Sequence, residues 1–197
     1  YAYDKLRART AALLIDVAQD ACVDLANEFK KSFTKKGGRI VQTTYCQSGD
    51  QDFTAQLAAV MAAKPDILYL PNYYTEDALI GKQAAEIGLK TTIMSSDGAQ
   101  APELIAIGGK SVEGFLLTGH FEKNAVTSKL GKSFLQHYLK ANRSEVGSYE
   151  ALGADAYFIL LDAIERAKST AGPKVRAALA STRNFEGVSG TIHLGEN

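Results

Sequence analysis

The sequence predicts an α/β fold built on a parallel β-sheet. Short apolar runs alternate with amphipathic helical segments along the first part of the chain, and the runs begin about every 22–28 residues, which is the length of one βα unit. Beyond about Gly119 the alternation stops, and helical patterns follow one another directly. Crossovers between parallel strands are right-handed, so helices are expected on both faces of the sheet.

Five segments in the first part of the chain have the character of strands. Each is short and apolar or rich in β-branched residues, and each is bounded by helical or turn signals. Strands are therefore expected at Ala11–Asp16, Arg39–Tyr45, Asp66–Pro71, Thr91–Ser96 and Glu113–Thr118.

Helices are predicted between these strands. Apolar residues recur every fourth position on one face of Val23–Lys36, and Gly37 and Gly38 end that helix. Asp52 and Thr75 are of the residue types that cap helix N-termini, and they are expected to begin the next two helices.

The second part of the chain is predominantly helical. Apolar stripes predict helices around Leu130–Tyr138, Leu152–Ala163 and Lys174–Ala180, and only Gly190–Leu194 reads as a strand. These stripes must be buried, so we expect a covering sheet that lies outside this sequence. Residues 1–119 are then expected to be the second lobe of a two-lobed protein, and residues 120–190 a helical segment of its first lobe. Residues 191–197 are expected to form a strand that leads back toward the second lobe.

Composition excludes several classes of partner. The 197 residues include 22 basic and 22 acidic side chains, so the formal charge is zero, and no electrostatic footprint for nucleic acid or an anionic membrane is expected. There is no apolar run of about 18 residues and no signal-peptide pattern. The first residues, Tyr1–Arg7, read as the end of a helix.

The polar residues that follow the predicted strands form a candidate binding edge. In open parallel sheets, ligands bind beyond the carboxyl ends of the strands. The residues there are carboxylates, amides and phenols, without lysine or arginine, so a cationic or hydroxyl-bearing group is favoured over a phosphate. This edge comprises Asp16–Cys22, Cys46–Asp50, Asn72–Tyr74 and Asp97–Gly98.

Asp97 and a tyrosine pair are the sharpest candidates at this edge. The Asp97 carboxylate could accept charge-assisted hydrogen bonds from an ammonium group, or it could simply cap a turn. Tyr73 and Tyr74 could cover a ligand through stacking or cation–π contact, or they could be a packed, half-exposed pair. Sequence alone leaves both alternatives open.

Motifs for catalysis and for cofactors are missing. There is no Gly-x-Gly-x-x-Gly, and Gly109-Lys110-Ser111 lacks the first glycine of a phosphate loop. The histidines are widely separated, and Cys22 has no evident base. We therefore expect a protein that is not an enzyme and that has neither cofactor nor metal site.

The two cysteines leave two interpretations open. Cys22 and Cys46 each follow a predicted strand, and those strands are expected to be neighbours. A Cys22–Cys46 disulfide could then form in an oxidising compartment, or both could be buried thiols.

Motifs along nearly the whole chain resemble the branched-chain amino-acid-binding proteins of ABC importers. They occur in the order typical of that family. They are Ala11–Asp20, Gly49 with Asp52–Leu57, Lys64–Asp66, Ala78–Ala84 with Gly88–Lys90, Ser96–Gly98, Val112–Gly114, Asp155-Ala156 with Ala163-Ile164, and Gly187–Gly190.

The resemblance implies a type I periplasmic binding fold, in which two α/β lobes close on a ligand in the cleft between them. It implies an extracytoplasmic solute-binding protein that is periplasmic or extracellular, with a lipoprotein anchor as one variant, and an ABC permease as its membrane partner. The ligand would be an amino acid or a related small amine-bearing solute. A ligand-sensing domain of a receptor or regulator with the same fold is the alternative.

The resemblance also implies roles for individual residues. Asp97 matches the acidic residue that holds the ligand's ammonium group, and Tyr73 matches an aromatic residue that packs near it. The run Asp20-Ala21-Cys22 stands where relatives commonly have Asp-Tyr-Ser, with the tyrosine facing the ligand. Ala21 therefore opens the pocket or leaves room for a bulkier side chain, so the expected ligand is not restricted to leucine, isoleucine or valine. The predicted ligand-binding set is Asp97, Tyr73, Ala21, Asp20 and Tyr74.

Overall fold

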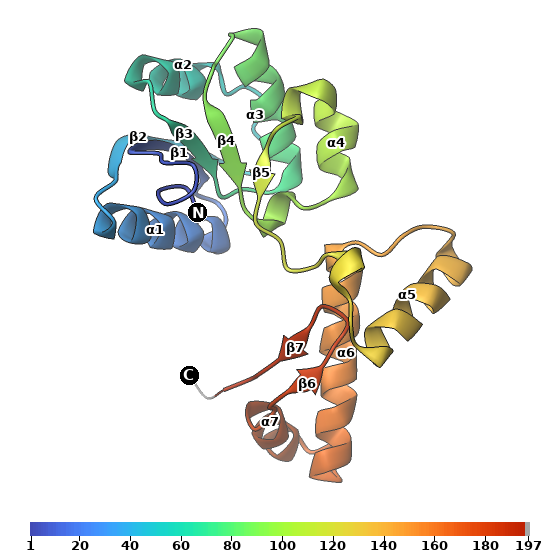
Figure 1. The fold of residues 1–197 in the computed structure, drawn as a ribbon. Coiled ribbons are helices and arrows are strands. Elements are labelled where there is room, and N and C mark those ends of the chain that lie inside the picture. Colours follow the sequence, from blue (N-terminus) through green and yellow to red (C-terminus); the bar gives the residue numbers. More distant parts are fainter. Residues whose placement is uncertain (196–197) are drawn as a thin grey trace. The chain divides into compact units, whose positions relative to one another are not determined.

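The computed structural model describes residues 1–195 and divides the chain into two compact units, Tyr1–Thr118 and Gly119–Asn197 (Figure 1). The division falls just after the last strand of the first unit, where the sequence pattern also changes. The assignment of the two units to the lobes of a larger protein stays a prediction.

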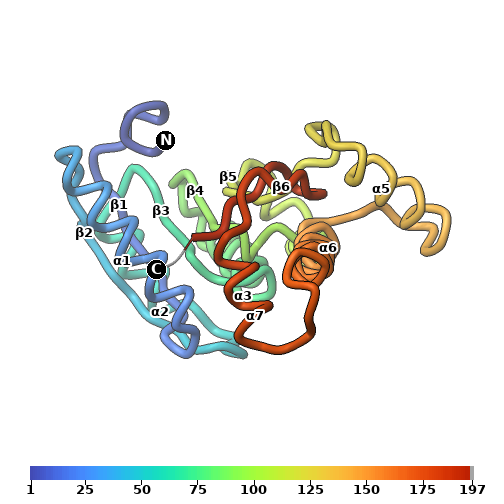
Figure 2. The backbone as a smooth tube through the Cα atoms, turned by 90° about the horizontal axis from the view of Figure 1, so that it is seen from below, coloured from blue at the N-terminus to red at the C-terminus, as the bar shows by residue number. Residues whose placement is uncertain are grey.

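The first unit contains the predicted parallel sheet, which confirms the α/β fold class. Its strands lie in the order β2-β1-β3-β4-β5, and every pair is parallel; Figure 2 shows them side by side in this order. Their bounds are β1 (Thr10–Asp16), β2 (Arg39–Cys46), β3 (Ile67–Leu70), β4 (Thr92–Ser95) and β5 (Leu116–Leu117). β5 is shorter than expected because only two of its residues pair with β4 at the edge of the sheet.

Helices cover both faces of this sheet (Figure 1). α1 (Asp20–Lys35) packs on one face, where Leu13 of β1 joins Phe33 of the helix in one apolar cluster. On the other face, α2 (Thr54–Ala63) and α3 (Tyr74–Glu86) bury their apolar residues against Leu14 and its neighbours. α4 (Pro102–Gly108) packs against α3. Successive residues of β1 thus enter different cores, as expected for a central strand buried on both faces.

Local structure differs from the prediction at three places. Asp52 does cap α2, but from one residue before the N-cap position: its Oδ1 accepts a hydrogen bond from the backbone N–H of Thr54 at 2.9 Å. Thr75 is not a cap, because α3 already begins at Tyr74. The first residues form a turn in which the Lys5 backbone N–H donates to the Tyr1 carbonyl at 2.8 Å, so the predicted helix end is wrong.

The second unit contains the three predicted helices, α5 (Lys129–Asn142), α6 (Ser148–Ala167) and α7 (Gly172–Ala180). It also contains an antiparallel hairpin, β6 (Phe185–Glu186) and β7 (Thr191–Ile192), of which the sequence pattern predicted only the second strand. The strand predicted over residues 191–197 is thus shorter and pairs with β6 inside this unit; residues 196 and 197 lie outside the described part of the chain.

α6 leaves a row of large apolar side chains exposed. These side chains follow one another at helical spacing and have exposed fractions of 37–59%; they are Tyr149, Leu152, Tyr157, Leu160 and Leu161. Within residues 1–195, neither α6 nor any other helix combines the length and apolar character needed to cross a bilayer. The exposed row is therefore an apolar face of α6 that stays partly exposed among the described residues.

Candidate functional site

Buried polar side chains gather at the carboxyl ends of β1, β3 and β4, which are neighbours in the sheet. This is the edge beyond which open parallel sheets bind ligands. Each of these side chains is at most 1% exposed: Asp16, Asn72, Asp77, Ser95 and Ser96. Buried polar groups are costly unless they are hydrogen-bonded, so their partners determine the local structure.

Asn72 is the centre of this network. Its Oδ1 accepts a hydrogen bond from the Asp16 backbone N–H at 2.8 Å, and its Nδ2 donates to the Leu14 carbonyl at 3.1 Å. The same Nδ2 donates to Asp77 Oδ1 at 3.3 Å. The Ser96 hydroxyl donates to the Asn72 carbonyl at 3.3 Å. The side chain and the backbone carbonyl of Asn72 therefore join the ends of β1 and β3 to α3 and to the loop after β4.

Asp77 lies at the start of α3 and is fully buried. Its second carboxyl oxygen contacts the Ser95 hydroxyl, and that hydroxyl also donates to the Leu70 carbonyl at 2.9 Å. Burial raises the pKa of Asp77 to about 8, because desolvation outweighs the hydrogen bonds that Asp77 makes with Ser95 and Asn72; the neighbouring acid Glu76 raises it further. A carboxyl group with this pKa carries its proton at neutral pH.

Tyr73 and Asp97 lie on two loops that pack directly against each other. Tyr73 precedes α3 and is 38% exposed, and Asp97 is half-buried at the start of the short helix η1 (Asp97–Ala99). Between them, Gly98 lies so close to the first loop that a Cβ atom there would be 2.8 Å from the Asn72 carbonyl oxygen. The structure therefore brings these two predicted site residues to neighbouring positions on one edge. Their contact with a ligand stays a prediction.

The other predicted site residues lie near the same carboxyl edge of the sheet but in different surroundings. Asp20 and Ala21 are exposed at the first turn of α1, which follows β1. Tyr74 is half-buried and packs against an apolar cluster that includes Ala99 and Leu104. Tyr74 thus has a packing role between α3 and α4, and its ligand role stays a prediction.

Sequence analysis placed Asn72 on the candidate edge but did not assign it a role in a hydrogen-bond network. It did not single out Asp77, and it treated Tyr69 only as part of a strand. The phenol of Tyr69 has its pKa raised to about 12, first by burial and then by the charges of Asp97 and Asp77. The interaction with Asp97 indicates that the β3 core and the η1 loop are electrostatically connected.

The two cysteines have the second of the two interpretations left open by the sequence. Cys22 and Cys46 are both buried and both free. Cys46 belongs to the core shared with α2 and α3, whereas Cys22 lies on α1 one turn before Ala26, which belongs to the core on the other face of the sheet. Burial raises the pKa of each thiol to about 12.

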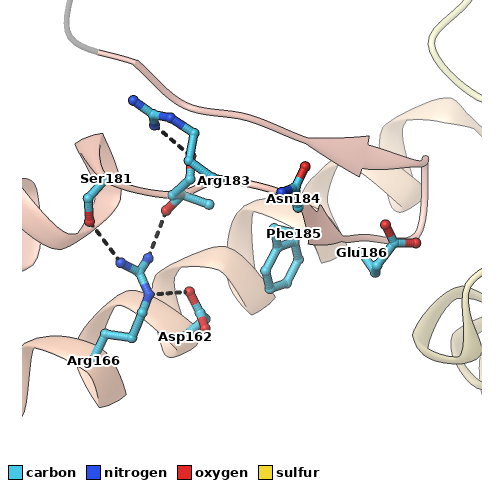
Figure 3. A pocket seen from close by; sticks show the side chains of 8 residues that line it. Asp162, Arg166, Ser181, Arg183, Asn184, Phe185 and Glu186 are labelled. Carbon is cyan, nitrogen blue, oxygen red and sulfur yellow. Dashed lines mark hydrogen bonds and ion pairs between the residues drawn. The ribbon is translucent and has the colours of Figure 1, made fainter.

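The second unit has a pocket of about 300 Å³ beside α6, α7 and β6, lined mainly by polar residues (Figure 3). Arg166 dominates it, but its guanidinium bonds within the unit: to Asp162 Oδ2 at 2.8 Å, to Ser181 Oγ at 3.0 Å and to Thr182 Oγ1 at 2.8 Å. These bonds fasten α6 to the end of α7, so the arginine has a structural role. Across the described residues, no group of three or more His, Cys, Asp or Glu side chains is placed to hold a metal ion.

Comparison with known proteins agrees with this architecture. A solved leucine-binding protein LivK from Thermotoga maritima is 44% identical and superposes with a TM-score of 0.95, covering 99% of this chain and 55% of that one. The branched-chain amino-acid transporter substrate-binding protein LivJ from Streptococcus pneumoniae, solved with isoleucine, is 27% identical with a TM-score of 0.85, covering 97% and 54%. A Leu/Ile/Val-binding protein homolog from Brucella melitensis is 28% identical over 173 residues, which are 87% of this chain and 46% of that protein.

The chain spans about half the length of the curated relatives it matches. The family model for periplasmic binding proteins matches residues 1–197, the whole chain. The match is to the family that the sequence motifs resemble, and the structural neighbours have the type I periplasmic binding fold. On this basis the chain belongs to the periplasmic binding protein family.

Proposed function

We propose that this chain is part of an extracytoplasmic solute-binding protein that serves an ABC importer and binds an amino acid or a related amine-bearing solute without turning it over. The names of its relatives support the solute class, since they describe the binding of leucine, isoleucine or valine. The departure at Ala21 supports a pocket wider than one made for those three side chains. The permease would be its partner at the membrane.

The observation that carries this proposal is the juxtaposition of Tyr73 and Asp97 at the carboxyl edge of the sheet. Asp97 would be the counter-ion of the solute's ammonium group, and the half-exposed ring of Tyr73 would cover that group by a cation–π contact. Asp20 and Ala21 would border the same site from α1, and Tyr74 would support it from behind. A second lobe would close over the edge and exclude water, which strengthens the charge pair.

The domain assignment is a second part of this proposal. Residues 1–119 would form the second lobe, residues 120–190 a helical segment of the first lobe, and residues 191–197 the return toward the second lobe. The exposed apolar row on α6 supports this, because a helix of the first lobe needs a sheet to cover it. Binding must therefore be measured on the full-length protein that contains this chain.

A thermal-shift and calorimetric screen of that full-length protein tests the function. We expect leucine, isoleucine, valine or a related amino acid to raise the melting temperature, and we expect the same amino acid lacking its amine to fail. Removal of the amine is the matched control, because it leaves the carboxylate and the side chain unchanged. An equal rise in melting temperature with the amino acid and with its deaminated analogue would contradict the proposed role of Asp97.

A further inference from the structure

The buried carboxyl group of Asp77 connects the two loops that carry the proposed site. Asp77 is fully buried and touches Asn72, which immediately precedes Tyr73, and Ser95, which lies two residues before Asp97. The connection therefore runs from one loop to the other through a single side chain that does not itself reach the solvent.

The number of hydrogens available on the Ser95 hydroxyl indicates whether the Asp77 carboxyl group is protonated when it makes this connection. The Ser95 hydroxyl lies 2.9 Å from the Leu70 carbonyl, its acceptor, and also contacts Asp77 Oδ2. A hydroxyl group has one hydrogen, so it can donate to only one of these oxygens. Both bonds exist together only if Asp77 is protonated and donates to Ser95, while Ser95 donates to Leu70.

The surroundings of Asp77 favour the same neutral form. The ionisable groups that interact electrostatically with it are an acid, two thiols and a phenol: Glu76 on α3, Cys22 on α1, Cys46 on β2 and Tyr69 on β3. Two further acids, Asp16 and Asp97, act on the thiols and on the phenol respectively. Burial raises the pKa of Cys22, Cys46 and Tyr69 to about 12, so these three keep their protons well above the range in which Asp77 titrates. A negative charge on Asp77 would be fully buried and would face the acid Glu76.

We infer that Asp77 is a positioning residue of the proposed solute site, which holds the Tyr73 loop against the Asp97 loop by donating its carboxyl proton to Ser95. This inference rests on the proposed function for its consequence in binding, but the link between the loops exists in the ligand-free protein. Loss of the proton leaves the single hydrogen of Ser95 to serve both Asp77 and the Leu70 carbonyl, so one of the two bonds is lost. The packing of Tyr73 against Gly98 then loosens. The solute affinity then falls as the pH rises through the pKa of Asp77.

Nuclear magnetic resonance on the full-length protein tests the link without any ligand. With ¹³C-labelled aspartate, the Asp77 carboxyl carbon is expected to titrate near pH 8, and the backbone amides of Tyr73 and Gly98 are expected to shift with the same midpoint. Asp77→Asn keeps a hydrogen-bond donor toward Ser95 and has no proton to lose, so these amides should stay still over the same range. Asp24→Asn, at an exposed position on α1, is the control. In this variant the Asp77 carboxyl carbon and the two loop amides should shift with pH as they do in the wild type. A carboxyl midpoint near 4, or amide shifts that persist in Asp77→Asn, would overturn the inference.

Calorimetry with leucine tests the consequence for binding. Between pH 7 and pH 9 the wild-type affinity is expected to fall at least about fivefold more than that of Asp77→Asn. The titration of leucine itself is common to both proteins and cancels in this comparison. Equal losses in the two proteins would overturn the positioning role. If leucine binds neither protein at any pH, the proposed solute class fails, and the loop amides alone decide the inference about Asp77.

Discussion

Gly98 packs so closely on Tyr73 that a Cβ atom on the glycine would lie 3.2 Å from Cδ1 of the tyrosine ring. The same atom would lie 2.8 Å from the carbonyl oxygen of Asn72, which is backbone and cannot rotate away. The small residue is therefore required by the close approach of two loops.

Gly98→Ala is predicted to push these loops apart. Overpacking of this kind costs about 1–3 kcal/mol of unfolding free energy, and it should weaken solute binding because Tyr73 and Asp97 no longer share one geometry. Urea unfolding and calorimetry with leucine measure the two effects. The matched control is Gly153→Ala on α6, where a Cβ atom meets nothing within 4 Å. Wild-type affinity in Gly98→Ala would show that the loop contact is irrelevant to binding.

Asp97→Ala is predicted to lower the affinity for leucine by about 2–5 kcal/mol, because it removes one partner of a charge pair that closure desolvates. Asp97→Asn should recover part of this loss, since it retains hydrogen-bond acceptance without the charge. Asp24→Ala, an exposed acid on α1, is the control for a general change in charge. Affinity that is the same in wild type and in Asp97→Ala would contradict the role assigned to this residue.

Asp77 is predicted to make the protein less stable as the pH rises. Its pKa is raised from 3.8 to about 8, so the folded state holds a proton that the unfolded state has already lost. The contribution of Asp77 to the free energy of unfolding therefore falls between about pH 4 and pH 8 and is level above that range. Asp77→Asn lacks this pH dependence. The difference in free energy of unfolding between Asp77→Asn and wild type should therefore be more favourable to the variant at pH 8 than at pH 4, by on the order of 2–5 kcal/mol. Urea unfolding at both pH values measures this difference, and equal pH slopes in the two proteins would contradict it.

The parallel sheet was predictable because each strand signal is local. β1 and β3 are buried almost completely, so they read as continuous apolar runs, and the residues that follow them had to lie at the carboxyl edge. This is why Tyr73 and Asp97 could be selected from the sequence. Their contact through Gly98 could not be predicted, because it depends on which strands are neighbours.

The network around Asn72 was not predictable for the same reason. Asn72 is 56 residues from Asp16 and 24 residues from Ser96, and only the strand order brings them together. β6 escaped prediction because a strand of two residues is too short to show an alternating pattern. The state of Cys22 and Cys46 stayed open in the sequence because the adjacency of two strands does not fix the geometry that a disulfide requires.

Both cysteines are predicted to react slowly as long as the protein is folded. Burial raises the pKa of Cys22 and Cys46 to about 12, so almost no thiolate is present at neutral pH, and neither sulfur is accessible. Mass spectrometry after alkylation should show no modification under native conditions and two modified thiols in urea without reductant. Two thiols that become reactive only after reduction would instead demonstrate a disulfide.

Asp155→Ala is predicted to destabilise the second unit because it removes a buried hydrogen-bond acceptor. The Asp155 carboxylate on α6 is buried and accepts hydrogen bonds from the backbone N–H groups of Val188 and, at 2.9 Å, Ser189, which form the turn between β6 and β7. Alanine leaves the Val188 N–H buried without an acceptor, which costs about 1–3 kcal/mol in addition to the lost packing. Glu165→Ala, on the exposed side of the same helix, is the matched control. Because both variants remove one acidic side chain from α6, a larger loss for Asp155→Ala in urea unfolding isolates the turn contact, and equal losses would show that the hairpin is held by its apolar residues alone.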